Sequence, residues 1–341
     1  MSDTQRILIV KLSSFGDVLH ALPTLEALRT AFPAAHITWL VEAQFAPLLV
    51  GHPALDEVWP VPRVRPGRKA GKDELLQLLR LARRVRAAAF DLVIDLQGLL
   101  KSAMWVALAK GKRKVGYDRT RELSYLALTE RLAPYDPEAH AVWRYLNVAR
   151  HLGAPPAPPR FRLGLTPVLP KFLHHQDRPL VALHPGARWP TKLWPASYWA
   201  EVADWLIREK NLAVAITGSA ADRELAAQIC ARMHEKPWNL AGRTSLPELA
   251  GIMQQARLAL TADTGPMHLA AALGTKVVAV FGPTAPARTG PFGPGHRVVR
   301  LELPCSPCFQ RRCPEPRCLL DLTPDAVRAA CEKILSTDVK N

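Results

Sequence analysis

The chain has 341 residues, of which 48% are hydrophobic and 22% are charged, values that suit a folded protein of two domains and exclude wholesale disorder, collagen-like and coiled-coil architectures. Its 45 Lys and Arg against 30 Asp and Glu give a formal net charge of +15, which predicts an anionic partner: nucleic acid, anionic lipid or a phosphorylated substrate. No apolar run is long enough for a membrane-spanning helix, and six cysteines in a chain of this size do not suggest a disulfide scaffold.

Apolar runs of strand length recur along the chain, and each is followed by a helical pattern. In chain order these runs are 7–10, 37–41, 92–94, 180–183, 212–216, 258–260 and 277–281. This alternation predicts a parallel α/β architecture. The first run is too short for the central region of a signal peptide and no small-residue cleavage site follows it, so a cytoplasmic location is expected.

Prolines concentrate between Gly153 and Pro179, so this segment cannot form a long helix, and we interpret residues 166–178 as a linker. Residues 1–165 and 179–322 are then expected to form two doubly wound, Rossmann-like domains that face each other across a cleft. In such folds ligands bind at the carboxyl ends of the strands. The last helical pattern, at 324–335, lies in a C-terminal helix and tail (323–341), for which we consider packing on the first domain.

Basic residues concentrate in the first half of the chain. Nine of them against two acidic residues lie between Arg63 and Arg86, and six against one lie between Lys110 and Arg121. One such run is usually a solvated surface, but two in one domain favour an anion-binding site. The first run contains no Phe, Tyr or Trp that could stack on bases, so a nucleic-acid-binding protein is a distant alternative.

The loop at 11–20 leaves the first strand and enters a helix, which places Asp17 at the carboxyl end of that strand. A helix N-terminus lowers the pKa of a carboxyl group, so Asp17 would stay ionised and could act as a general base for an attacking hydroxyl. The alternative is that Asp17 only caps the helix. The loop lacks the glycine spacing of a dinucleotide site and the Gly-Lys-Ser/Thr ending of a P-loop, which argues against a dehydrogenase or an NTPase.

A second junction of strand and helix lies at 258–271. Asp263 or Thr264 is expected to cap the helix, Gly265 allows close approach, and Pro266 begins the first turn. The free amides of that turn suit a diphosphate, and His268 could add a hydrogen bond or a positive charge. The alternative is a well-capped core helix whose histidine makes its hydrogen bonds within the protein.

Two other strands are followed by residues that suit a phosphorylated sugar. Lys192 and Arg188, after the strand at 180–183, could neutralise phosphate, or they belong to an ordinary surface loop. Glu224, after the strand at 212–216, could hold sugar hydroxyls, or it is a solvated helix residue.

Four cysteines near the end of the chain have the spacing C-x2-C-x4-C-x4-C; they are Cys305, Cys308, Cys313 and Cys318. Such a group could bind structural zinc or an iron–sulfur cluster, or remain as free thiols or a redox-labile pair. The last spacing is not that of a standard zinc ribbon.

In order and spacing these motifs resemble glycosyltransferase family 9, the ADP-heptose:lipopolysaccharide heptosyltransferases, over nearly the whole chain. The resemblance rests on residues 13–20, 91–102 and 140–142 and on the Asp263-Thr264-Gly265-x-x-His268 motif. It implies a GT-B fold and an inverting transfer that needs neither a catalytic metal nor a cofactor. Asp17 is then the base that deprotonates the acceptor hydroxyl while ADP leaves the heptose.

The resemblance also implies roles for other residues. Lys192 would contact the donor phosphates, Glu224 the donor hydroxyls and the Thr244 backbone the adenine. The implied donor-binding set is Ser14, Gly16, Lys192, Glu224, Thr244, Asp263, Thr264, Gly265 and His268. The implied acceptor-binding set is Arg63, Arg65, Arg68, Lys69, Lys101, Arg121 and Arg144.

Within the family, the N-terminal motifs are most similar to those of the type I enzymes, whose acceptor is Kdo-lipid A. This similarity implies ADP-heptose as donor, a peripheral location at the cytoplasmic face of the inner membrane, a monomer and no nucleic-acid partner. Gly186-Ala187 is closer to the type II pattern, so a type II enzyme, or a member with another donor or acceptor, stays open.

Overall fold

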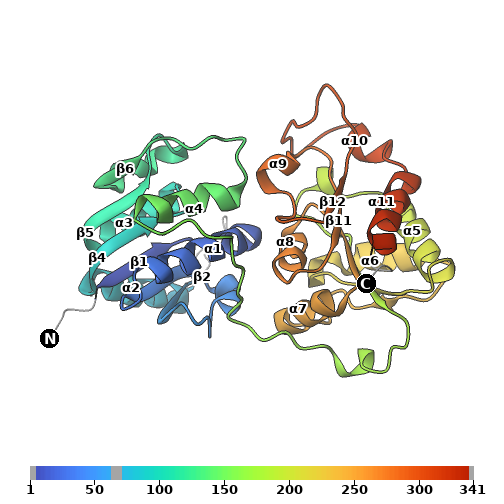
Figure 1. Cartoon of the computed structure of the whole chain (residues 1–341), viewed down its shortest axis with the longest axis horizontal. Helices are drawn as coiled ribbons and strands as arrows, with labels where there is room; N and C mark the ends of the chain where they lie inside the picture. Colours follow the sequence, from blue (N-terminus) through green and yellow to red (C-terminus); the bar gives the residue numbers. More distant parts are fainter. Residues whose placement is uncertain (1–4, 63–70, 338–341) are drawn as a thin grey trace. The chain divides into compact units, whose positions relative to one another are not determined.

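In the computed structural model, which describes residues 5–62 and 71–337, each half of the chain forms a six-stranded parallel sheet (Figure 1). The two compact units meet in sequence between Leu165 and Thr166. Their strand orders are β3-β2-β1-β4-β5-β6 and β12-β11-β10-β7-β8-β9, which is the same doubly wound order in both units. The predicted α/β class with two doubly wound units is confirmed.

The first unit alternates strands and helices along its sequence. Its strands are β1 (Arg6–Val10), β2 (His36–Glu42), β3 (Glu57–Val61), β4 (Ala89–Asp95), β5 (Lys110–Tyr117) and β6 (Glu130–Leu132). Its helices are α1 (Phe15–Ala31), α2 (Lys72–Ala87), α3 (Leu100–Leu108) and α4 (Ala141–His151), with 3-10 helices η1 (Ala43–Leu48) and η2 (Arg121–Ala127).

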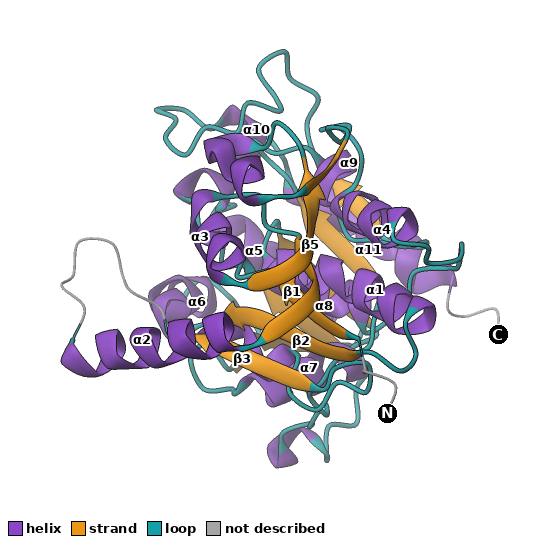
Figure 2. Ribbon diagram, turned by 90° about the vertical axis from the view of Figure 1, so that its left-hand side faces the viewer, coloured by secondary structure: helices purple, strands orange, loops and turns teal. Residues whose placement is uncertain are grey.

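The central strand of this unit is β1, which pairs in parallel with β2 on one side and β4 on the other. Its residues from Ile7 to Val10 are fully buried, as expected for a parallel strand that is covered by helices on both faces. Helices α1 and α4 pack together on one face, while α2 and α3 cover the other (Figure 2).

The second unit repeats this plan. Its strands are β7 (Leu180–His184), β8 (Ala213–Ile216), β9 (Trp238–Asn239), β10 (Leu258–Ala262), β11 (Val277–Val280) and β12 (Arg297–Val299). Its helices are α5 (Ala196–Arg208), α6 (Arg223–Cys230), α7 (Leu246–Gln255), α8 (Gly265–Ala272), α9 (Pro286–Thr289), α10 (Arg317–Leu320) and α11 (Pro324–Thr337), with 3-10 helices η3 (Lys171–Leu173), η4 (Pro190–Lys192) and η5 (Ala220–Asp222).

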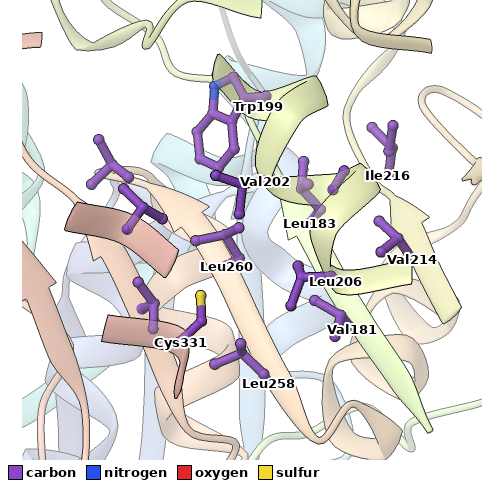
Figure 3. Close-up of a cluster of buried hydrophobic side chains, with 14 of the residues drawn as sticks. Val181, Leu183, Trp199, Val202, Leu206, Val214, Ile216, Leu258, Leu260 and Cys331 are labelled. Carbon is purple, nitrogen blue, oxygen red and sulfur yellow. The ribbon is translucent and has the colours of Figure 1, made fainter. Parts of the chain in front are cut away.

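Alternate residues of β7 face the two cores of the second unit, as the period of a strand requires. Val181 and Leu183 point into a core shared with α5 and α11, which Figure 3 shows. Leu180 and Ala182 face the other core, which α7 and α8 complete. Burial of both faces fixes the register of β7, because a shift by one residue would exchange the two sets.

The C-terminal helix α11 covers the predicted range. Val327, Cys331 and Ile334 are buried in the core of the second unit, where α11 contacts α5 and β12 (Figure 3). The amphipathic pattern predicts a helix with one buried face, but it does not identify the surface that covers that face.

The proline-rich segment contains no long helix, as predicted. Between Gly153 and Pro179 the only helical piece is η3, whose Leu173 joins the core of the second unit. Ahead of it, the Val168 N–H donates to the Pro247 carbonyl at 2.9 Å. Among the described residues, none of the helices is long and apolar enough to cross a membrane.

Candidate functional site

In each unit the two loops that follow the central strand pair meet at one place. Strand order reverses between β1 and β4 in the first unit and between β7 and β10 in the second. At such a reversal, the connections from the two neighbouring strands lead to opposite sides of the sheet. The loops at the ends of these strands therefore border a crevice, which is the usual ligand-binding position of doubly wound sheets. The candidate residues on these four loops can therefore be assessed unit by unit.

In the first unit, Gln97 ties the two loops together. Its side-chain oxygen accepts hydrogen bonds from the N–H groups of Leu12, at 3.1 Å, and Ser13, at 3.0 Å. Gln97 itself is held by Asp95, the last residue of β4, whose carboxylate accepts from the Gln97 N–H at 2.9 Å. The loop that carries Asp17 is thus anchored to the neighbouring strand.

Asp17 lies in the first turn of α1, and its carboxylate is held by three hydrogen bonds. Oδ2 accepts from the N–H of Ser14 at 3.0 Å and from its hydroxyl at 2.8 Å, while Oδ1 accepts from the Tyr145 hydroxyl at 3.1 Å. A carboxylate offers about four acceptor positions, so among the described contacts one position on Oδ1 is left for a substrate proton. The side chain is 34% exposed, so substrate can reach it.

A buried lysine lies beneath this carboxylate. The Lys11 ammonium is 4.0 Å from Asp17 Oδ1 and donates to the Tyr145 hydroxyl at 2.7 Å, and its side chain is only 2% exposed. Burial lowers the pKa of Lys11, and the negative charges of Asp17 and Asp95 partly offset this lowering. Burial alone would raise the pKa of Asp17, but the Lys11 charge and the Ser14 hydrogen bonds hold it well below its usual range.

The expected direction of the Asp17 shift is therefore found, although the helix N-terminus is not its main source. Ser14 is the N-cap of α1, and its N–H donates to Asp17. Asp17 therefore takes part in capping the helix and also carries an ionised carboxylate. Gly16 is buried in the same turn. Lys11 and Tyr145 were missed by the sequence analysis, because neither the end of a strand nor a helix 134 positions away signals this contact.

Of the expected acceptor-binding residues, the structure places two side chains near this loop. Lys101, on α3, donates to Ser13 Oγ and pairs with Glu42 at 2.8 Å. The Arg144 guanidinium lies 4.8 Å from the centre of the Tyr135 ring and lines a cavity of about 90 Å³ that Tyr145 also lines. Arg121 is the first residue of η2. Arg63, Arg65, Arg68 and Lys69 lie outside the described residues.

In the second unit, Lys192 and Asp263 form a largely buried ion pair. Lys192, the last residue of η4, has its Nζ 2.6 Å from Oδ2 of Asp263, the first residue after β10. The side chains are 16% and 5% exposed, and the Thr284 hydroxyl donates to the same carboxylate oxygen. The loops after β7, β10 and β11 thus converge on one carboxylate.

Helix α8 begins beside this ion pair. Thr264 is the N-cap of this helix. Its first residue is Gly265, so the helix begins one position before the expected start at Pro266. The positive end of the α8 dipole begins two residues after Asp263, which pairs with the Lys192 ammonium, and this arrangement attracts phosphate. His268, one turn further, is buried.

The structure places the two remaining donor-site candidates on neighbouring loops. Glu224 is exposed in the first turn of α6, where its carboxylate accepts from Gln228 at 2.9 Å. Half-buried Thr244 precedes Ser245, the N-cap of α7. Asp222, which the sequence analysis did not single out, packs so closely on Gly186 that a Cβ there would lie 2.4 Å from its carboxylate oxygen.

The four clustered cysteines line one cavity of about 270 Å³. Cys305, Cys308 and Cys313 are exposed, and all four are free thiols. Burial raises the pKa of Cys318, and its three neighbours raise it further. No three His, Cys, Asp or Glu side chains within the described ranges are placed to hold a metal ion.

Comparison with known proteins agrees with this arrangement. Residues 78–319 match the sequence model of glycosyltransferase family 9 (heptosyltransferase). The chain is 35% identical to lipopolysaccharide heptosyltransferase 1 of Pseudomonas aeruginosa, over 97% of this chain and 98% of the relative. It is 30% identical to lipopolysaccharide heptosyltransferase 2 of Salmonella typhimurium, over 87% and 88%. The solved structure of E. coli heptosyltransferase WaaC with ADP-2-deoxy-2-fluoro heptose has a TM-score of 0.76 at 28% identity, over 96% of this chain and 99% of that one.

Proposed function

The chain belongs to glycosyltransferase family 9, and we propose that it is a type I heptosyltransferase that transfers L-glycero-D-manno-heptose from ADP-heptose to the Kdo of Kdo-lipid A. The observation that carries the proposal is the Asp17 carboxylate, which Lys11 and Ser14 keep ionised in the first turn of α1. An ionised carboxylate with one open acceptor position can remove a proton from a sugar hydroxyl.

In the proposed reaction Asp17 Oδ1 takes the proton of the acceptor hydroxyl as that oxygen attacks the anomeric carbon of the heptose. The bond from that carbon to the diphosphate breaks on the opposite face, so the configuration inverts and ADP leaves. The proton stays on Asp17 until product is released. Tyr145 donates to the same oxygen throughout, which keeps the carboxylate oriented.

The second unit is proposed to bind the donor. The leaving ADP gains negative charge, which the Lys192 ammonium and the N-terminus of α8 would stabilise without a metal ion. Asp263 holds the Lys192 side chain in place for this task. Glu224 is proposed to hold donor hydroxyls and the backbone at Thr244 to contact the adenine, with Thr264, Gly265 and His268 completing the site; Ser14 and Gly16 would approach the donor from the first unit.

The acceptor of this proposal carries carboxylates and phosphates, which suits the basic first unit. Lys101, Arg121 and Arg144 are proposed to hold these groups, together with the arginines and lysine of residues 63–69. The enzyme would act as a monomer at the cytoplasmic face of the inner membrane, where a lipid-anchored acceptor is found.

A type II activity is the alternative that one observation favours, because Gly186-Ala187 is closer to the type II pattern than to the type I pattern. The test is transfer from ADP-heptose to two purified acceptors, Kdo-lipid A and the same acceptor already carrying one heptose, with product mass as the readout. Transfer to bare Kdo-lipid A supports the proposal. Transfer only to the heptosylated acceptor assigns type II, and transfer to neither refutes both.

A further inference from the structure

Helix α2 carries leucines on the face that the protein core does not cover. Leu75, Leu76 and Leu79 are 52%, 49% and 46% exposed, although Leu78 and Leu81 of the same helix pack on the core. Exposed leucines one turn apart form an apolar stripe rather than scattered single residues. The helix therefore has two apolar faces, and the structure accounts for only one of them.

The stripe continues onto the neighbouring elements. Helix α2 packs against α3, and α3 packs against η2, so the three elements adjoin one another. Met104 on α3 is 67% exposed, and Leu123 and Leu126 on η2 are 60% and 65% exposed. We call the exposed side chains of these three elements the leucine face; they are Leu75, Leu76, Leu79, Leu100, Met104, Leu123 and Leu126.

Basic residues accompany the leucine face. Arg80, Arg83 and Arg86 are exposed on α2, and none of them forms an ion pair with another described residue. Arg84 differs, because it pairs with Glu57 and stacks on Trp59 at 4.3 Å. Three uncompensated arginines beside exposed leucines are the residue combination of helices that lie in the headgroup region of an anionic membrane.

We propose that the leucine face docks on an anionic lipid bilayer, with its leucines in the acyl boundary and the α2 arginines on lipid phosphates. The inference deepens the proposed function and rests on it in one respect, because a lipid-anchored acceptor gives membrane docking its purpose. A protein partner is the less favoured occupant, because the exposed leucines lie on the same helix as three exposed arginines that form no ion pair with another described residue, and these outnumber the exposed acidic residues Asp73 and Glu122. Such a surface complements an anionic bilayer in both respects.

The test measures partition of the full chain onto vesicles of phosphatidylcholine alone and of phosphatidylcholine with phosphatidylglycerol. Wild-type protein is expected to bind the anionic vesicles. Its partition onto them is expected to fall at least tenfold as the salt concentration rises. Two sets of variants address the two parts of the surface. The first, Leu75→Ser/Leu76→Ser/Leu79→Ser, and the second, Arg80→Gln/Arg83→Gln/Arg86→Gln, should each lower partition at least tenfold.

Matched controls use exposed apolar residues elsewhere. Val50→Ser, on the first unit but away from α2, and Leu320→Ser, on α10, should partition as wild type does. Met104→Ser/Leu126→Ser supplies an independent loss-of-binding variant, should the leucine triple variant lower the melting temperature. Unchanged partition of the folded leucine and methionine variants would overturn the proposal, as would self-association through this face without vesicle binding.

The same proteins separate this inference from the proposed function. With a water-soluble, delipidated acceptor, the leucine variants should transfer heptose at the wild-type rate, because none of these leucines belongs to the site. Wild-type protein that binds anionic vesicles but transfers to no acceptor would refute the function and leave the docking surface standing. Active protein with no preference for anionic vesicles would refute the docking surface and leave the proposed function standing.

Discussion

The Tyr145 hydroxyl donates to Oδ1 of Asp17 at 3.1 Å, and the two residues are 128 positions apart in the chain. The same hydroxyl accepts from Lys11 at 2.7 Å, so helix α4 completes a site that begins at the end of β1. In the proposed mechanism Lys11 and Tyr145 are thus positioning residues, which would act on substrate through Asp17. Their substitution should alter the pH dependence of the reaction as well as its rate.

Replacing Lys11 by Met should move the acidic limb of the pH profile of kcat/KM to higher pH. The folded pKa of Asp17 lies below its usual value because of the Lys11 charge, so its removal lets the carboxylate protonate at a higher pH. Tyr145→Phe keeps the charge and should shift the limb less. Lys110→Met, on β5, serves as the control. An acidic limb at the same pH in Lys11→Met and wild type would contradict this role.

Replacing Lys192 by Met should weaken ADP-heptose binding on the order of 10- to 100-fold, the usual value of a charge-assisted contact. It also leaves the buried Asp263 carboxylate without its cation, so the melting temperature should fall. Donor affinity by calorimetry and thermal unfolding measure the two effects. Lys210→Met removes a cation that pairs with Glu332 on a more exposed surface and should change neither greatly. Wild-type donor affinity in Lys192→Met would remove this lysine from the donor site.

Glu224→Gln should raise the KM for ADP-heptose and leave binding of ADP alone unchanged, because the proposed partner of this carboxylate is the sugar. Gln228→Ala removes the neighbour that donates to Glu224 at 2.9 Å and should have little effect on either quantity. Equal loss of affinity for ADP and ADP-heptose in Glu224→Gln would place the residue near the nucleotide instead.

Stability should fall as the pH drops from about 6.5 towards 4, because of His184. Burial lowers the pKa of His184 to about 4, against an ordinary value of 6.5. Below pH 6.5 the unfolded chain binds a proton that the folded chain does not, which costs up to about 1.4 kcal/mol for each pH unit. His184→Gln should flatten this part of the pH profile of unfolding free energy, whereas His234→Gln, at an exposed position, should not. Identical profiles for wild type and His184→Gln would refute the assignment.

The sequence predicts the buried parts of the fold better than its edges. Largely apolar strands such as β1, β7 and β10 are recognisable because both of their faces are buried. Strand β5 begins with the sequence Lys-Gly-Lys-Arg-Lys. Because these first residues are largely exposed, their sequence shows no apolar run and indicates only a basic segment. The short outer strands β6, β9 and β12 have too few residues for a pattern.

For the site, local motifs indicate Asp17, Lys192 and Asp263 because each lies in the segment that connects a strand to the helix after it, or in the first turn of that helix. Contacts between distant segments carry no such local signal. The pairing of Lys192 with Asp263 depends on the reversal of strand order, which brings together the loops after β7 and β10. The Tyr145 hydroxyl reaches Asp17 and Lys11 because helix α4 packs against α1.

The most direct test of the account is the single-turnover rate of heptose transfer by Asp17→Asn, measured together with its affinity for ADP-heptose. Asparagine keeps the shape of the side chain but cannot accept the hydroxyl proton. The account predicts a loss of about 10²- to 10⁴-fold in rate with donor affinity close to that of wild type. A rate near that of wild type would contradict the assignment of Asp17 as the general base.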